Sequence, residues 1–176
     1  MPTSIWLQLS GEADRALRAV IAGLAAAHRT VPFQPHLTVC SLPHNEAAIV
    51  DAVADYVRRC GLLPLHARRA AISCSTAAPF RAVTIDVEDT SKLRAFREEV
   101  RRIAGAPELE PPHISLLYTI GEDRKPVAWA TDAARLRAIA NDATAVVGDF
   151  TLDAPVVTEA RGEWADIRSW KLVRRL

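Results

Sequence analysis

The sequence contains the same five-residue pattern twice, as PHLTV at 35–39 and as PHISL at 112–116. Each copy consists of a proline, a histidine, an aliphatic residue, a hydroxyl residue and a second aliphatic residue. In a β-strand, alternate residues point to the same face of the sheet. Each copy therefore predicts a strand that presents an imidazole beside a hydroxyl, with the aliphatic side chains buried behind them.

Two imidazoles and two hydroxyls facing one groove suit the cleavage of a phosphodiester. A neutral imidazole can take a proton from an attacking water, while a protonated one gives a proton to the leaving oxygen. The hydroxyls of Thr38 and Ser115 can donate hydrogen bonds to the non-bridging phosphate oxygens. Neither motif contains Lys or Arg, so we expect the phosphate charge to be met mainly by imidazolium and hydroxyl groups. We assign His113 as the base and His36 as the acid, with no metal and no other cofactor.

A single His-x-Ser/Thr string on a strand is more often a satisfied polar pair than a catalytic site. Two copies at matched places, one in each half of a 176-residue chain, favour a functional interpretation. The four residues His36, Thr38, His113 and Ser115 are therefore the predicted catalytic group.

Strand-like runs alternate with amphipathic helical stretches along the chain. Helices are predicted over 13–28, 46–60, 91–104 and 126–140. Strands are predicted over 4–9, from Pro35 onward, over 70–75 and 81–88, after the proline pair at 111–112, and in the C-terminal third. The two halves have a similar element order, and no Gly- or Ser-rich linker divides them. We therefore expect one α+β domain over residues 1–176, composed of two lobes.

The composition is that of a soluble globular protein, with 49% hydrophobic and 24% charged residues and a net charge of +1. This balance fits a small charged ligand better than long RNA. Three cysteines show no zinc or disulfide spacing, and no signal or membrane segment is evident. We expect a reduced, cytoplasmic protein with no metal site and no obligate protein partner.

Other candidate residues have structural interpretations. Cys40 is expected on the His36 face as a groove-wall residue, and His28 as a structural residue at a helix end. His44 and His66 are expected at the surface, and Trp164 and Trp170 in the core or between lobes. Arginine pairs at 58–59, 68–69, 101–102 and 174–175 are expected on solvated faces, although one of them could steer a phosphate.

The paired motifs resemble those of the two-histidine (2H) phosphoesterases, whose signature is two H-x-[ST]-x motifs, one in each lobe. PHISLLYTIG is similar to the second motif of the cyclic phosphodiesterase branch, where a tyrosine follows the histidine by five. SIWLQL resembles the first strand of that branch, which carries a tryptophan. The resemblance implies a bilobal α+β fold, with two antiparallel sheets flanking a central groove and helices outside.

The resemblance also implies hydrolysis of a 2′,3′-cyclic nucleotide, or of ADP-ribose 1″,2″-cyclic phosphate, to a phosphomonoester. Tyr118 and Trp6 would contact the base or sugar of a small nucleotide or RNA-end cyclic phosphate. Tyr118 has the opposite strand parity to His113, so this role requires a twist or the end of the strand. Two alternatives remain open, a 2′,5′ RNA ligase-like enzyme acting on RNA ends and a catalytically idle RNA- or nucleotide-binding module.

Overall fold

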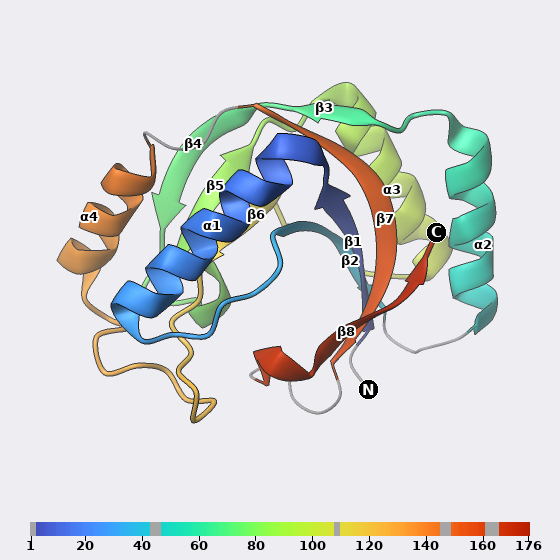
Figure 1. Ribbon diagram of the computed structural model, residues 1–176. Coiled ribbons are helices and arrows are strands. Elements are labelled where there is room, and N and C mark those ends of the chain that lie inside the picture. The colour runs from blue at the N-terminus through green and yellow to red at the C-terminus, as the bar shows by residue number, and fades with distance from the viewer. Residues whose placement is uncertain (1–2, 43–46, 108–109, 145–148, 161–165) are drawn as a thin grey trace.

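The computed structural model describes residues 3–42, 47–107, 110–144, 149–160 and 166–176. These ranges contain four helices, eight strands and two short 3-10 helices (Figure 1). The helices are α1 (Gly11–His28), α2 (Ala47–Cys60), α3 (Ser91–Ala104) and α4 (Ala133–Thr144). The strands are β1 (Thr3–Leu9), β2 (His36–Leu42), β3 (Leu65–Ala67), β4 (Arg69–Cys74), β5 (Val83–Val87), β6 (His113–Leu117), β7 (Phe150–Ala160) and β8 (Trp170–Arg175).

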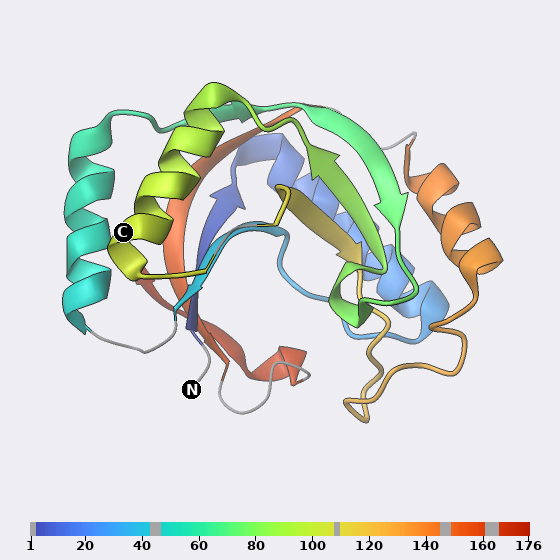
Figure 2. The ribbon, with the colours of Figure 1, turned by 180° about the vertical axis from the view of Figure 1, so that it is seen from behind.

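The strands form one antiparallel sheet in the order β3-β7-β1-β2-β6-β5-β4, and β8 pairs with the outer side of β7. The predicted α+β class is confirmed, but the prediction of two separate sheets is wrong. The two halves of the sheet are continuous because the motif strands β2 and β6 pair directly, at Leu37 and Ile114. Figures 1 and 2 show the sheet as a curved arch, with α4 at one end and α2 and α3 at the other.

The pairing of Leu37 with Ile114 determines the positions of the four motif residues. In an antiparallel pair, residues on either side of such a contact lie opposite one another and share a face. His36 therefore lies opposite Ser115, and Thr38 lies opposite His113. The two imidazole–hydroxyl pairs are consequently related by a local two-fold axis through the Leu37–Ile114 contact.

A β-bulge in β2 separates the motif from the residues that follow it. Ile5 of β1 pairs with Cys40, whereas Trp6 pairs with Thr38, so Val39 is the extra residue. Such an insertion reverses the alternation of side chains beyond it. Val39 and Cys40 therefore both lie in the core, and the prediction that Cys40 lies on the groove wall is wrong.

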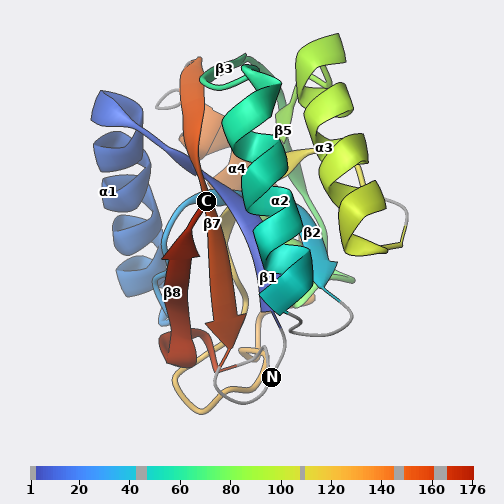
Figure 3. The ribbon, with the colours of Figure 1, turned by 90° about the vertical axis from the view of Figure 1, so that its right-hand side faces the viewer.

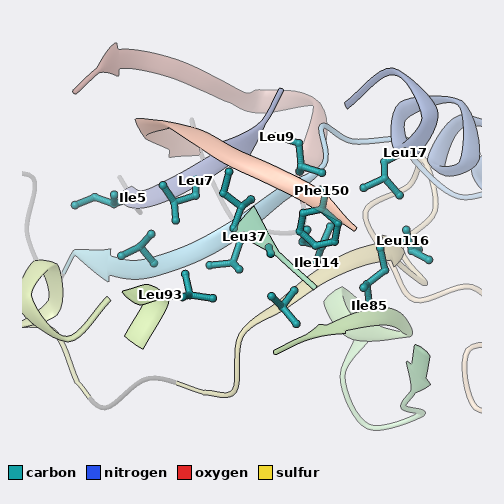
Figure 4. Close-up of a cluster of buried hydrophobic side chains, with 14 of the residues drawn as sticks. Ile5, Leu7, Leu9, Leu17, Leu37, Ile85, Leu93, Ile114, Leu116 and Phe150 are labelled. Carbon is teal, nitrogen blue, oxygen red and sulfur yellow. The ribbon is translucent and has the colours of Figure 1, made fainter. Parts of the chain in front are cut away.

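The core lies behind the motif strands and is covered by the helices. Leu37 and Ile114 are fully buried in one cluster with Leu17 of α1 and Leu93 of α3 (Figure 4). α1 packs against β6, and α3 packs against β2, so a helix from each half of the chain covers the motif strand of the other half. In side view, α1 lies on one side of β1 and β7, and α2 and α3 lie on the other (Figure 3).

The predicted bounds of three helices are close to those observed, but the fourth begins later than predicted. α4 starts at Ala133 rather than at Pro126, because Pro126 forms an isolated bridge with Ile120 and the chain turns before Asp132. The Asp132 carboxylate then accepts a hydrogen bond from the Arg135 backbone N–H at 3.0 Å, as a capping residue does. Ser10 precedes α1, but its side chain makes no capping hydrogen bond.

Replacing one side of the central contact is expected to destabilise the fold strongly. Ile114→Ala leaves a cavity in the buried cluster and should lower the free energy of unfolding by about 2–5 kcal/mol. Urea unfolding followed by circular dichroism measures the loss. Leu172→Ala is the control, because Leu172 is 42% exposed and its loss should be within about 0.5 kcal/mol. Equal losses in the two variants would contradict this description of the core.

Candidate active site

A groove of about 320 Å³ opens on the face of the sheet that carries the motif residues. It is lined by all four predicted catalytic residues and by both predicted substrate-binding residues, Trp6 and Tyr118. Ser4, Ser41 and Glu110 line it next to those residues in the sequence, and the segment 78–81 and Trp170 line it from other parts of the chain. The structure thus brings the two motifs to one concave site of the size that small ligands occupy.

The two imidazoles are held in the same way. His36 Nδ1 lies 2.7 Å from the Gln34 carbonyl oxygen, and His113 Nδ1 lies 3.0 Å from the Pro111 carbonyl oxygen. A carbonyl only accepts, so in each neutral ring Nδ1 carries the proton and donates it. Each ring therefore keeps Nε2 for a proton transfer, as an acceptor when the ring is neutral and as a donor when it is charged.

His36 is the more buried of the two histidines. It is 7% exposed, and its ring stacks on the Trp6 indole with centroids 3.6 Å apart and planes inclined by 10°. Burial lowers the pKa of His36 to about 4; the Gln34 hydrogen bond opposes the shift, and His113 adds to it. His36 is therefore a neutral acceptor at pH 7.

His113 is less buried and lies among charged groups. Burial lowers its pKa, the Pro111 hydrogen bond opposes this, and Arg81 lowers it further. The carboxylates of Glu110 and Asp86 act in the opposite direction. Asp86 is the cross-strand partner of His113 in β5, and its carboxylate accepts hydrogen bonds from the Ser73 and Thr84 hydroxyls. The two imidazoles therefore differ in environment although their backbone anchors match.

The two motif hydroxyls also differ. Ser115 is buried and donates a hydrogen bond of 2.8 Å to the Phe80 carbonyl oxygen. Thr38 is half-buried on the groove wall. Ser115 must therefore turn its proton away from Phe80 before it can donate to a ligand in the groove.

Aromatic rings form one wall of the groove. The rings of Trp6 and Tyr118 each make an edge contact with Trp170, with centroids 5.6 and 5.8 Å apart. Phe80 makes an edge contact with Tyr118 at 5.3 Å. Tyr118 lines the groove just beyond Leu117, where β6 ends, so the strand-end condition on its position is met. Trp170, expected in the core or between lobes, belongs to this wall.

The groove also contains a cation that the sequence did not indicate. Arg81 lies at the groove, where it forms an ion pair with Glu110. Arg81 is the last residue of the short 3-10 helix Pro79–Arg81, far from either motif in the sequence, and no local pattern marks it. Arg81 thus adds a cation to a groove where we expected imidazolium and hydroxyl groups to provide most of the charge for a phosphate.

Several other candidates lie away from the groove. His66 is exposed on β3, as expected. His28 ends α1, where burial and Arg135 lower its pKa, and its Nδ1 lies 3.0 Å from Arg135 Nη2. Burial raises the pKa of the Cys40 thiol to about 12. His44 and Trp164 lie outside the described residues.

Three of the arginines predicted on solvated faces form ion pairs at the surface. Arg58, Arg102 and Arg174 each pair with a nearby carboxylate on an exposed face. In the described part of the chain, no group of three His, Cys, Asp or Glu side chains is arranged to hold a metal ion. None of the described helices is both long and apolar enough to cross a membrane.

Comparison with known proteins gives structural matches only. No protein-family model and no curated protein sequence matches the chain. A crystal structure of a phosphoesterase matches with a TM-score of 0.63 and 15% identity, over 99% of this chain and 95% of that one. Escherichia coli LigT complexed with ATP matches with a TM-score of 0.61 and 15% identity, over 99% and 96%. LigT complexed with 3′-AMP matches with a TM-score of 0.57 and 14% identity, over 100% and 98%.

The chain has the fold of the two-histidine phosphoesterases. The resemblance inferred from the paired motifs is thus confirmed for the fold. At about 15% identity these matches show the fold and do not assign a substrate, because one fold can host different chemistries.

The burial of His36 predicts a stability change with pH. Its folded-state pKa of about 4 is below the unfolded value of about 6.5, so the unfolded chain binds the extra proton first. The contribution of the neutral His36 to the free energy of unfolding is therefore present above pH 6.5 and is lost as the pH falls toward 4. Lowering the pH from 7 to 5 should therefore cost roughly 2 kcal/mol through His36.

Urea unfolding at the two pH values, compared with His36→Gln, isolates this contribution, because the variant keeps the other titrating groups. An NMR titration should find the His36 imidazole neutral at pH 5. Titration of His36 near pH 6.5, with equal pH dependence in parent and variant, would contradict the described environment.

Proposed function

We propose that the protein is a metal-independent cyclic phosphodiesterase that hydrolyses 2′,3′-cyclic nucleotides to phosphomonoesters by two-histidine acid/base catalysis. The observation that carries the proposal is the matched geometry of the two motifs. Both imidazoles are anchored through Nδ1 to the carbonyl two residues earlier, and both stand beside a hydroxyl on one groove. We also propose that residues 1–176 act as one bilobal unit, because both halves of the chain line this groove.

The proposed reaction is an in-line displacement at phosphorus. One neutral imidazole takes a proton from water through Nε2, and the resulting oxygen attacks phosphorus. The bond from phosphorus to one ring oxygen breaks, and the second imidazole, protonated, gives its Nε2 proton to that leaving oxygen. An acid and a base related by a local two-fold axis lie on opposite sides of a phosphorus atom bound between them, as in-line attack requires.

The environments favour His36 as the base and His113 as the acid, the reverse of the assignment made from the sequence. His36 is buried against Trp6 and stays neutral, so it is ready to accept a proton. Burial and Arg81 lower the pKa of His113, but the Glu110 and Asp86 carboxylates oppose this, so His113 takes a proton more readily than His36, whose pKa burial lowers to about 4. A bound phosphodiester anion adds to this effect, because a nearby negative charge raises the pKa of an imidazole.

The remaining groove residues would bind the substrate. Thr38, Ser115 and the Arg81 guanidinium can donate to the non-bridging oxygens, with Arg81 leaving Glu110 to do so. Trp170 and Phe80, both half-buried at the groove, offer aromatic surface for a nucleobase, and the buried rings of Trp6 and Tyr118 line the groove beside them. The structures of LigT with ATP and with 3′-AMP, on the same fold, support a nucleotide as the ligand class.

Turnover of the four nucleoside 2′,3′-cyclic phosphates, with a chelator present, tests the proposal. His36→Ala and His113→Ala should each lower kcat by about 100- to 10,000-fold, because each removes one proton transfer. His66→Ala, on the exposed strand β3, is the control and should leave kcat unchanged. Full activity in either motif variant would refute two-histidine catalysis. If the parent shows no turnover, these substrates are wrong, and ADP-ribose cyclic phosphate and RNA ends are tested next.

Two charge variants should shift the pH profile in opposite directions. If His113 is the acid, activity falls as the pH rises through its pKa. Asp86→Asn lowers that pKa, so the basic limb of kcat/KM should move to lower pH. Arg81→Gln raises it, so the limb should move to higher pH, and KM should rise about tenfold through the lost phosphate contact. Shifts of the same sign in both variants would contradict the role given to His113.

A further inference from the structure

Arg97 is a buried cation on α3. It is 5% exposed, and its helix neighbours Phe96 and Val100 belong to the core. Burying a guanidinium is unfavourable unless the charge is paired and hydrogen-bonded. Its Nη1 lies 3.8 Å from Asp89 Oδ1, which is too far for a hydrogen bond, and Nε has no hydrogen-bond partner within the described part of the chain. Its close contact is a hydrogen bond of 2.5 Å from Nη2 to the Glu110 carbonyl oxygen.

The segment that receives this bond leads directly into the second motif. Pro111 and Pro112 have no backbone N–H, so this part of the chain is fixed mainly through its carbonyl groups. The Pro112 carbonyl accepts from the Val87 backbone N–H at 2.9 Å. The Pro111 carbonyl accepts from His113 Nδ1, and the Glu110 carbonyl accepts from Arg97. Three successive carbonyls therefore define the path of the chain into His113, and a side chain from outside the sheet holds the first of them.

Arg97 also lies close to the reacting groups without entering the groove. It lines a smaller cavity of about 190 Å³ that shares Thr38 and His113 with the groove, and Pro111 lines the same cavity. Arg97 does not line the groove itself.

We propose that Arg97 is a positioning residue for His113. By holding the Glu110 carbonyl it fixes the adjoining Pro111 carbonyl, which in turn keeps the His113 ring oriented with the proton on Nδ1 and Nε2 toward the groove. This inference rests on the proposed function for its effect on turnover, but not for its effect on the ring.

Imidazole ¹⁵N NMR of the full chain tests the proposal together with steady-state kinetics. Arg97→Met removes the donor and the buried charge while keeping most of the side-chain volume. The His113 ring should lose its uniform Nδ1–H tautomer, while His36, anchored by Gln34, should keep its own. Misplacement of His113 should lower kcat about 10- to 100-fold with little change in KM. In Arg97→Lys the ammonium can still donate to the Glu110 carbonyl, so this variant should recover part of the His113 Nδ1–H tautomer and part of kcat.

Arg94→Met is the matched control. Arg94 lies about one helical turn before Arg97 on α3, and its side chain is 58% exposed. A folded Arg97→Met variant with the parent tautomer and kcat would overturn the proposal. Loss of folding in both Arg97 variants, with Arg94→Met folded, would also overturn it, because Arg97 would then serve the fold alone. If the parent lacks turnover on cyclic nucleotides, the proposed function fails, while the tautomer comparison still decides the role of Arg97.

Discussion

The antiparallel contact between Leu37 and Ile114 is the constraint on which the rest of the site depends. It joins the two halves of the sheet through their motif strands and buries both side chains completely. Because side chains alternate along a strand, burying these two residues turns His36, Thr38, His113 and Ser115 to the opposite face. A shift of one residue in this register would bury the imidazoles and expose the core, so packing and site geometry are determined together.

A symmetric backbone carries two chemically different imidazoles. Both donate through Nδ1 to the carbonyl two residues earlier. Trp6 covers one ring and excludes water from it, while the other ring lies beside the charges of Arg81, Glu110 and Asp86. Proton transfer in two directions needs one group that is neutral and one that can be charged. Local burial and charge supply this difference where the repeated motif alone does not.

The sequence predicted those features that depend on alternation and on local pattern. The motif strands and the shared face of each His–hydroxyl pair followed from residue spacing, whereas the strand end that Tyr118 required was supplied by the fold. The features it did not predict depend on contacts between distant segments. The bulge at Val39 sends Cys40 into the core, and the pairing of β2 with β6 makes one sheet of two. Arg81 and Trp170 reach the groove only through the folded chain, so no local pattern marked them.

The claim that the two histidines act as a unit on one phosphodiester is tested most directly by combining their substitutions. Turnover of 2′,3′-cyclic nucleotides would be measured for His36→Ala, His113→Ala and the double variant under the same conditions. If acid and base serve one concerted displacement, the double variant should be no more than a few-fold slower than the slower single variant. Losses that multiply in the double variant would show that the two residues act independently, and would contradict the account.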